Sequence, residues 1–492
     1  MDYGVEIDWS QPFLSQWAEL YKKVPKLALW QKGSNTNCLY ANNVYDSKNC
    51  YLSYSVVEAE DILYSENIDF GRYIMDSWLC ISSELVYENQ GSRQFNSKFI
   101  LQSNDCIDSA FLFDCANCQS CFMSCNLRNK KYVFRNQQLT KESYEKAIAT
   151  ENLSSRKKLD GLRKEWKGLI KGAIHKYSRV VASVNSTGNF VRNAKNTRDS
   201  FQIHDIENVA YSMRGLDFKD CMDIYATAHG ELIYEGMSCS SGVYGNFFSL
   251  NCNDTNNIFY TAHCQSGSNL FGSVGLRKKD YVILNKQFTK EEYNELVPKI
   301  KQHMLDMPYI DKKGRIYSFG EFFPIEFSPF GYNETLANEF FALSEAKATQ
   351  KGFNFYNHKD KSYAPTMTTE EIPDTISETS PGILKQTIPC RHAPNGKAEC
   401  NQLCTTAFKV TEDEYSFYKR MNIPVPELCP NCRHYERVSF FFEPPKLYSG
   451  ECMCDSATHD HEGKCKNQFK TPYAPGRPEK LYCESCYNKE IY

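Results

Sequence analysis

Short clusters of apolar and aromatic residues recur from residue 51 to residue 281, with polar residues between them. Asn, Asp, Ser and Gly fill the gaps and favour turns, so these short, evenly spaced strands predict a mainly β fold. Two such strands span about 23 residues, close to one coil of a parallel β-solenoid, in which each rung stacks its apolar side chains on the next. An antiparallel sandwich is the alternative. The clusters begin 10 to 14 residues apart, near Tyr51, Ile62, Tyr73, Leu85, Phe99, Phe111, Phe122 and Tyr132, and again near Tyr211, Ile224, Tyr234, Phe247, Phe259, Phe271 and Tyr281.

The repeat region is duplicated. Residues 127–145 and 276–294 are identical at eleven of nineteen positions, without a gap, at an offset of 149. We therefore predict two β-repeat units of the same topology, at 35–136 and 185–305. A helix is expected to begin near Thr140 after the first and near Thr289 in the second, where Thr289 and Glu292 form a capping box.

The remaining segments are assigned from composition and helical spacing. We predict a leader with an amphipathic helix (1–34), a basic helical segment (137–184) and an irregular connector (306–388) rich in proline. The end of the connector, 359–388, is rich in Ser, Thr and Glu and is expected to be flexible. Two tandem zinc ribbons, 389–445 and 446–492, complete the predicted organisation.

The last 103 residues hold ten cysteines, including the pairs Cys429/Cys432 and Cys483/Cys486. Each C-x2-C pair is the tight turn that aims two thiolates at one tetrahedral Zn²⁺. Upstream, both halves repeat the order Cys, Cys or His, three residues, Cys, three residues, Phe. The sequence therefore predicts two zinc ions.

Several residues compete for the upstream ligand positions, because a tetrahedral ion takes four ligands. We favour closed, structural sites; a catalytic zinc on His459 or His461, with Asp460 or Glu462 nearby, is the alternative. Site one also offers Cys390 and His392; site two also offers Cys452, His459 and His461. The favoured sets are Cys400, Cys404, Cys429 and Cys432 for site one, and Cys454, Cys465, Cys483 and Cys486 for site two.

A third cysteine run lies within the first repeat unit. Its residues Cys115, Cys118, Cys121 and Cys125 have the C-x2-C-x2-C-x3-C spacing of bacterial ferredoxins. The usual following proline is replaced by Asn126, and other single cysteines recur across the repeats. We favour cysteines stacked on successive rungs over an iron–sulfur cluster or an extra zinc here.

Composition narrows the class of protein. The chain has 492 residues, a net charge of −3 and 22 cysteines, so it is not a globally basic nucleic-acid packager. Its N-terminus lacks the layout of a signal peptide, and no apolar run approaches the ~20 residues of a membrane span. We expect a cytoplasmic protein without a membrane partner, in which cysteines are ligands or core residues. No Walker or Rossmann glycine motif is present, which favours a non-enzymatic role.

Most of the chain resembles a group of uncharacterised bacterial zinc-ribbon proteins. The resemblance implies a zinc-ribbon protein with a cysteine-containing repeat region, and it implies no activity. The segments that carry it are Cys404 to Phe408, Glu414 to Tyr418, Pro424-Val425-Pro426, 429–437, 471–487, the repeat end at 276–293 and the stretch 321–335.

Three functions are consistent with this pattern. The first is a zinc-binding module that docks on nucleic acid or a nucleoprotein of the ribosome type, because basic side chains can neutralise phosphates. The second is a protein-interaction scaffold that uses the solenoid face, with purely structural zinc. The third is a carbohydrate-active β-helix enzyme, although no dense carboxylate cluster supports it. The residues expected to contact nucleic acid are Lys164, Lys167, Lys171, Arg433 and Arg437.

Overall fold

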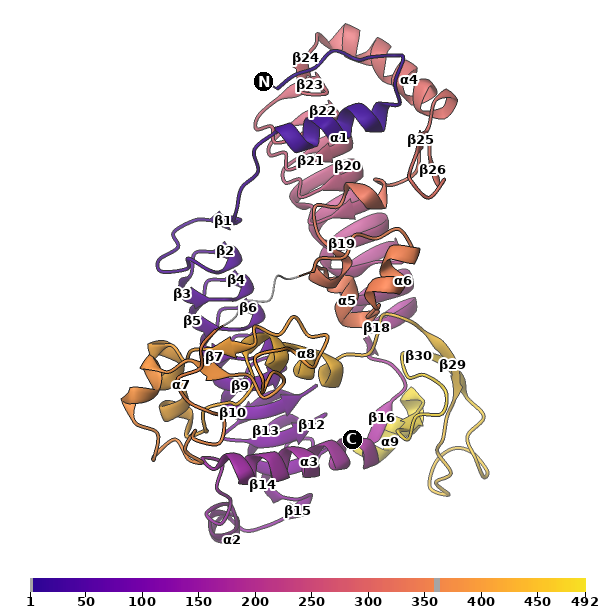
Figure 1. Cartoon of the computed structure of the whole chain (residues 1–492). Coiled ribbons are helices and arrows are strands. Elements are labelled where there is room, and N and C mark those ends of the chain that lie inside the picture. Colours follow the sequence, from indigo (N-terminus) through magenta and orange to yellow (C-terminus); the bar gives the residue numbers. More distant parts are fainter. Residues whose placement is uncertain (1–2, 358–362) are drawn as a thin grey trace.

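The computed structural model describes residues 3–357 and 363–492. Its main features are two parallel β-solenoids whose chains run in opposite directions (Figure 1). The first solenoid comprises residues 31–138 in a 15-stranded sheet, and the second comprises residues 180–287 in an 8-stranded sheet. The chain reverses between them through two helices, so that the start of each solenoid lies beside part of the other (Figure 1). The prediction of a mainly β, solenoid-like fold is confirmed.

The strands of the first solenoid are β1 (Gln31–Lys32), β2 (Asn42–Tyr45), β3 (Lys48–Tyr51), β4 (Tyr54–Val57), β5 (Glu60–Leu63), β6 (Glu66–Asp69), β7 (Arg72–Met75), β8 (Trp78–Ile81), β9 (Glu84–Gln90), β10 (Phe95–Leu101), β11 (Asn104–Ile107), β12 (Ala110–Phe113), β13 (Ala116–Cys125), β14 (Lys131–Phe134) and β15 (Gln137–Gln138). Those of the second are β17 (Val180–Val181), β18 (Val184–Ala210), β19 (Met213–Met237), β20 (Ser240–Leu250), β21 (Asn256–Ala262), β22 (Ser268–Phe271), β23 (Asp280–Ile283) and β24 (Lys286–Gln287).

The remaining strands are β16 (Ile174–Lys176), β25 (Tyr309–Ile310), β26 (Ile316–Tyr317), β27 (Ile388–Pro389), β28 (Ala407–Phe408), β29 (Tyr448–Glu451), β30 (Gln468–Thr471) and β31 (Lys480–Tyr482). The helices are α1 (Phe13–Lys23), α2 (Lys141–Ile148), α3 (Arg156–Gly172), α4 (Lys290–Asp306), α5 (Leu336–Phe340), α6 (Glu345–Gln350), α7 (Glu412–Met421), α8 (Pro430–Phe441) and α9 (Glu484–Ile491).

Each solenoid coil has 12 residues, not about 23. Paired residues on most neighbouring coils differ by 12 in number, as in Cys50 with Ile62 and Ile258 with Leu270, and at a few coils by 11 or 13, as in Val86 with Ser97 and Gly230 with Val243. A plain strand alternates its side chains with a period of two. Here a left-handed residue recurs at every third position, such as Asn43, Asp46 and Asn49, and every third side chain points inward. Asn and Asp tolerate this conformation better than most residues, which explains the polar residues between the apolar clusters.

The interior of the first solenoid alternates large and small side chains. Ile62, Ile68 and Ile74 are fully buried; Ile62 stacks on Ile74, one coil later, and Ile68 stacks between Val56 and Cys80. Between them lie small residues whose hydroxyls connect successive coils: the Ser65 hydroxyl donates to the carbonyl of Leu63 at 2.8 Å and accepts the amide of Ser77, one coil later, at 3.1 Å. The narrow core is therefore filled by dispersion contacts and by hydrogen-bonded serine ladders.

Both solenoids end in the same way. An antiparallel pair, β14–β15 or β23–β24, precedes a helix, α2 or α4. Thr140 and Thr289 are the N-caps of these helices, and Thr289 forms the predicted capping box with Glu292. These predictions are confirmed.

The segments outside the repeats pack on the solenoids. Helix α1 buries Phe13 and Trp17 against the second solenoid, where the Phe13 and Phe271 rings meet edge to face. The connector was expected to end in a flexible stretch; residues 358–362 lie outside the described part, but beyond them Ile372, Ile376 and Ile383 are buried with α3 and the first solenoid. That expectation was wrong because these three apolar residues anchor the segment. Within residues 3–357 and 363–492, no helix has the length and apolarity needed to span a membrane.

Candidate metal centres and binding cleft

Four cysteines converge in the first metal module, residues 389–445. The Sγ atoms of Cys390, Cys404, Cys429 and Cys432 lie within 4.8 Å of one another. Cys390 directly follows β27, and Cys404 lies shortly before β28. The pairing of these two strands therefore brings the two cysteines together. Cys429 is the N-cap of α8, which places Cys432 in the first turn of the helix. Such a four-thiolate set fits a tetrahedral, soft metal ion such as Zn²⁺.

The favoured assignment of Cys400 to this set is corrected by the structure. The alternate, Cys390, takes the fourth position, because the β27–β28 hairpin fixes it there. Cys400 lies next to Cys432, at an Sγ–Sγ distance of 3.7 Å, in a neighbouring group with His392.

The second metal module, residues 446–492, repeats the arrangement. Cys452, Cys465, Cys483 and Cys486 are all buried and have their Sγ atoms within 4.8 Å of one another. The antiparallel strands β29 and β30 bring Cys452 and Cys465 together, and Cys483 is the N-cap of α9. The sequence favoured Cys454 here; instead the alternate, Cys452, belongs to this set. Cys454 lies in an adjoining group with His459, His461 and Cys486.

The surroundings of these cysteines act in both directions: hydrogen bonds with neighbouring thiols lower the pKa of Cys390 and Cys429, whereas burial raises the pKa of Cys452 to about 11. The Cys429 amide donates to Cys390 Sγ at 3.3 Å, and the Cys483 amide donates to Cys452 Sγ at 3.2 Å. Burial alone would raise the pKa of Cys483, but hydrogen bonds from Ser485, from the Cys486 amide and from Asn467 outweigh it and lower that pKa to about 6. Helix N-termini stabilise negative charge in the same way. Because each set supplies four donors, the arrangement is that of a closed, structural site.

The two arginines of the first module that were expected to contact nucleic acid, Arg433 and Arg437, instead form buried ion pairs. Arg433 Nε lies 3.0 Å from Asp76 Oδ2, and Arg437 Nη1 lies 2.9 Å from Asp76 Oδ1. Asp76 belongs to the first solenoid and is fully buried, and Arg433 is also near Glu414, at 3.5 Å. These arginines dock the module on the solenoid. The three predicted lysines, Lys164, Lys167 and Lys171, are exposed on α3.

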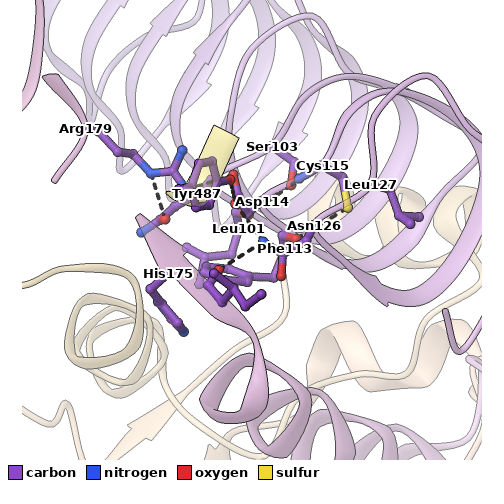
Figure 2. Close-up of polar contacts among 12 residues, drawn as sticks. Leu101, Ser103, Phe113, Asp114, Cys115, Asn126, Leu127, His175, Arg179 and Tyr487 are labelled. Atoms are coloured by element: carbon purple, nitrogen blue, oxygen red, sulfur yellow. Dashed lines mark hydrogen bonds and ion pairs between the residues drawn. The ribbon is translucent and has the colours of Figure 1, made fainter. Parts of the chain in front are cut away.

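The second module is docked through a buried carboxylate of the first solenoid, Asp114 (Figure 2). Asp114 accepts from Arg179 at 3.0 Å and from Arg128 at 3.2 Å, and the Tyr487 hydroxyl of α9 also donates to it. Burial opposes ionisation, but Arg179 and Arg128 hold the pKa of Asp114 below its usual value. Strand β31 also pairs with β16, so this module contacts the connection between the two solenoids.

A cleft of about 2590 Å³ lies between the two solenoids. It is lined by the N-terminal segment, both solenoids, the connector and the end of α9. Its charged lining is predominantly basic, because three acidic residues, Asp46, Asp69 and Asp205, face ten basic ones. The basic residues are Lys26, Lys32, Arg93, Arg128, Lys176, Arg179, Arg192, Arg214, Arg277 and Lys351. Sequence reasoning missed this surface because its residues come from distant parts of the chain.

The ferredoxin-like run folds as part of the solenoid interior. Cys115, Cys118 and Cys121 are buried at consecutive inward positions, so their spacing is the three-residue period of the coil. Their thiols donate to the carbonyls of Phe113, Ala116 and Gln119 at 3.4, 3.4 and 3.5 Å. Among the described residues, the four His/Cys groups that bring three or more ligand atoms together all lie in the two metal modules.

The two C-terminal cysteine clusters have the ligands and the compactness to form zinc-binding sites. The structure adds a solenoid built from 12-residue coils, to which both modules are docked by buried ion pairs or hydrogen bonds. No protein-family model and no curated protein matches the chain.

Proposed function

We propose that this protein is a non-enzymatic binding module that takes a single-stranded nucleic acid in the cleft between its solenoids, with structural zinc in both metal modules. The observation that carries the proposal is the excess of basic over acidic residues in the cleft lining. The net charge of the chain is −3, so attraction of a polyanion must be local.

Not every basic residue of the cleft is available to a ligand. Five of the ten form ion pairs with carboxylates: Arg93 with Asp105, Arg128 and Arg179 with Asp114, Lys176 with Glu484, and Arg214 with Glu66. Lys32, Arg192 and Arg277 are exposed; Arg192 lies near Asp205, whose pKa is lowered by hydrogen bonds from His204 and Asn193 and, to a smaller extent, by this arginine. These three exposed residues come from three segments, and because Arg192 and Arg277 are about seven coils apart in the second solenoid, a bound strand must run along that solenoid to reach both.

Aromatic side chains accompany these charges. The lining includes Trp30, Tyr54, Phe190 and Phe330, of which Tyr54 and Phe330 are exposed. Proteins that bind single strands combine a positively charged groove with aromatic rings on which bases stack. The cleft supplies both elements, and the lysines of α3 offer a second basic surface.

The chemistry of the cysteines supports a reducing, cytoplasmic location. All 22 are free thiols in the structure, and free thiols and zinc thiolates persist where disulfides do not form. The enclosed four-cysteine sets support zinc in a structural role rather than a catalytic one.

A protein-interaction scaffold is the second candidate, because part of the cleft is apolar and exposed. Leu27, Phe330 and Phe341 have 74%, 59% and 47% of their surfaces exposed in its lining. Exposed apolar patches of this kind are typical of protein-binding surfaces.

The test is binding of a fluorescent single-stranded oligonucleotide to the full chain at increasing salt. Affinity should fall steeply with salt, because each neutralised phosphate releases counterions. The variant Lys32→Glu/Arg192→Glu/Arg277→Glu should weaken binding about tenfold or more. The matched variant Lys164→Glu/Lys167→Glu/Lys171→Glu reverses the same number of charges on α3 and should have a smaller effect.

Metal content and thermal unfolding of both variants control for misfolding. A larger effect of the α3 variant would move the interface from the cleft to that helix. Absence of binding at low salt, or no effect of either variant, would contradict the proposal and favour the protein scaffold.

A further inference from the structure

The second metal module contains more metal ligands than one ion can use. Beyond its four-cysteine set, Cys454, His459 and His461 form a further group with Cys486, and their ligand atoms also lie within 4.8 Å of one another. Cys454 Sγ lies 3.0 Å from His459 Nδ1, and Cys486 Sγ lies 3.5 Å from His461 Nε2. Cys486 therefore belongs to both groups.

Hydrogen bonds fix both imidazoles in the form that binds a metal. His461 Nδ1 lies 2.8 Å from the carbonyl oxygen of Gly463, which can only accept, so Nδ1 carries the proton and Nε2 is left with its lone pair. His459 Nε2 lies 3.1 Å from Glu490 Oε2, which leaves Nδ1 free to face Cys454. Metal-bound histidines characteristically donate their other ring N–H to a carbonyl or carboxylate in this way.

We propose that the second metal module holds two metal ions bridged by the thiolate of Cys486. Two four-coordinate ions that share one thiolate require seven donors, and the module supplies seven. One ion has the donors Cys452, Cys465, Cys483 and Cys486; the other has Cys454, His459, His461 and Cys486. Thiolate and neutral imidazole ligands suit Zn²⁺ at both positions.

The first metal module shows the same arrangement in a less complete form. His392 and Cys400 adjoin Cys432, which is shared with the four-cysteine set and is the second cysteine of its C-x2-C pair, as Cys486 is. His392 Nδ1 again faces an acceptor, Gln402 Oε1, at 3.1 Å. Because this group has three Cys or His donors rather than four, the proposal is confined to the second module.

The alternative is a single ion in the second module, with Cys454, His459 and His461 as ordinary polar neighbours. It leaves unexplained why both histidines present a free nitrogen to the sulfur atoms. It also gives no reason for the shared position of Cys486. The two possibilities differ by one metal ion per chain.

The first measurement is the zinc content of the full chain and of the variant His459→Ala/His461→Ala. The variant should contain one ion fewer per chain than the unaltered protein, because its four-cysteine site remains. A control, Thr458→Ala/Glu462→Ala, changes the same loop without removing a donor and should keep every ion. Equal zinc content in the histidine variant and the unaltered protein would overturn the proposal.

The second measurement uses ¹¹³Cd²⁺ in place of zinc and detects the bridge directly. The unaltered chain should give a signal for an ion with two sulfur and two nitrogen ligands, split by coupling to its neighbour through Cys486 Sγ. Both signal and splitting should be absent from the double histidine variant. The variant His461→Cys keeps a donor, so it should retain the ion and shift its signal; loss of the ion there, or an unsplit signal in the unaltered chain, would contradict a bridged pair.

Discussion

Pairs of cysteines separated by two residues occur in both the solenoid and the metal modules, and they do different things. In the solenoid, the thiols of Cys115 and Cys118 donate to carbonyls two residues back. In the modules, the first cysteine of each pair, Cys429 or Cys483, instead donates its backbone amide to the sulfur of an upstream cysteine, Cys390 or Cys452. What separates the two regions is the grouping of the sulfur atoms: in each module two further cysteines join the pair, so that four sulfur atoms lie within 4.8 Å of one another, as a tetrahedral metal ion requires.

The difference follows from the backbone around each pair. In the solenoid a left-handed residue at every third position turns both sulfurs of a C-x2-C pair toward a narrow core. In the modules the first cysteine of each pair, Cys429 or Cys483, is the N-cap residue of a helix, and the second, Cys432 or Cys486, lies in the first turn of that helix. Spacing alone therefore does not identify a metal site; the conformation between the cysteines decides.

Removal of metal should produce the largest contrast between the two regions. A strong chelator should unfold residues 389–492, because a structural zinc contributes about 10–16 kcal/mol to the folding of small zinc domains. The solenoids are held by stacked coils and should keep their β signal in circular dichroism. Limited proteolysis before and after chelation tests this, and unchanged protection of the modules would contradict it.

The variant Asp76→Ala tests the contact between the first solenoid and the first metal module. It leaves Arg437 without its buried partner and Arg433 with only Glu414, and loss of one member of a buried ion pair costs about 3–5 kcal/mol. Chemical denaturation should show this loss while zinc content stays the same. Asp413→Ala, at an exposed position in the first turn of α7, should cost much less; an equal loss in both variants would argue against this contact.

A smaller, pH-dependent effect is expected within the second solenoid. Burial, with the nearby Asp223 carboxylate, raises the pKa of Glu235 to about 7. Since the folded state holds this proton more tightly than the unfolded state, its stabilising contribution is present below about pH 4.5 and is lost as pH rises through about 7.

Glu235→Gln cannot lose a proton, so its melting temperature should fall less than that of the unaltered protein between pH 5 and pH 8. The exposed variant Glu231→Gln is the control. An unchanged slope in Glu235→Gln would show that Glu235 does not titrate in this range.

The solenoid was predictable because its apolar clusters are evenly spaced, but its coil length was not. The 12-residue coil depends on left-handed residues at every third position, and Leu52 and Tyr64 are among them. These residue types do not signal that conformation. The offset of 149 and the caps at Thr140 and Thr289 were visible because duplication and helix capping leave local sequence signals.

The metal modules were predictable at their C-x2-C pairs and less so upstream. Cys390 and Cys452 replace Cys400 and Cys454 in the four-cysteine sets because strand pairing, not sequence distance, positions them. In the sequence, Arg433 and Arg437 look like residues that could bind phosphate. In the structure both form ion pairs with Asp76, which lies more than 300 residues before them. A tertiary ion pair of this kind has no local signal.

The most direct test of the distinction between the two kinds of cysteine is the zinc content of two matched variants. Cys118→Ser and Cys432→Ser each alter a C-x2-C cysteine in the full chain. Cys118→Ser should retain all the zinc of the unaltered protein, and Cys432→Ser should lose at least one ion per chain. Loss of zinc from Cys118→Ser, or full zinc content in Cys432→Ser, would contradict the account.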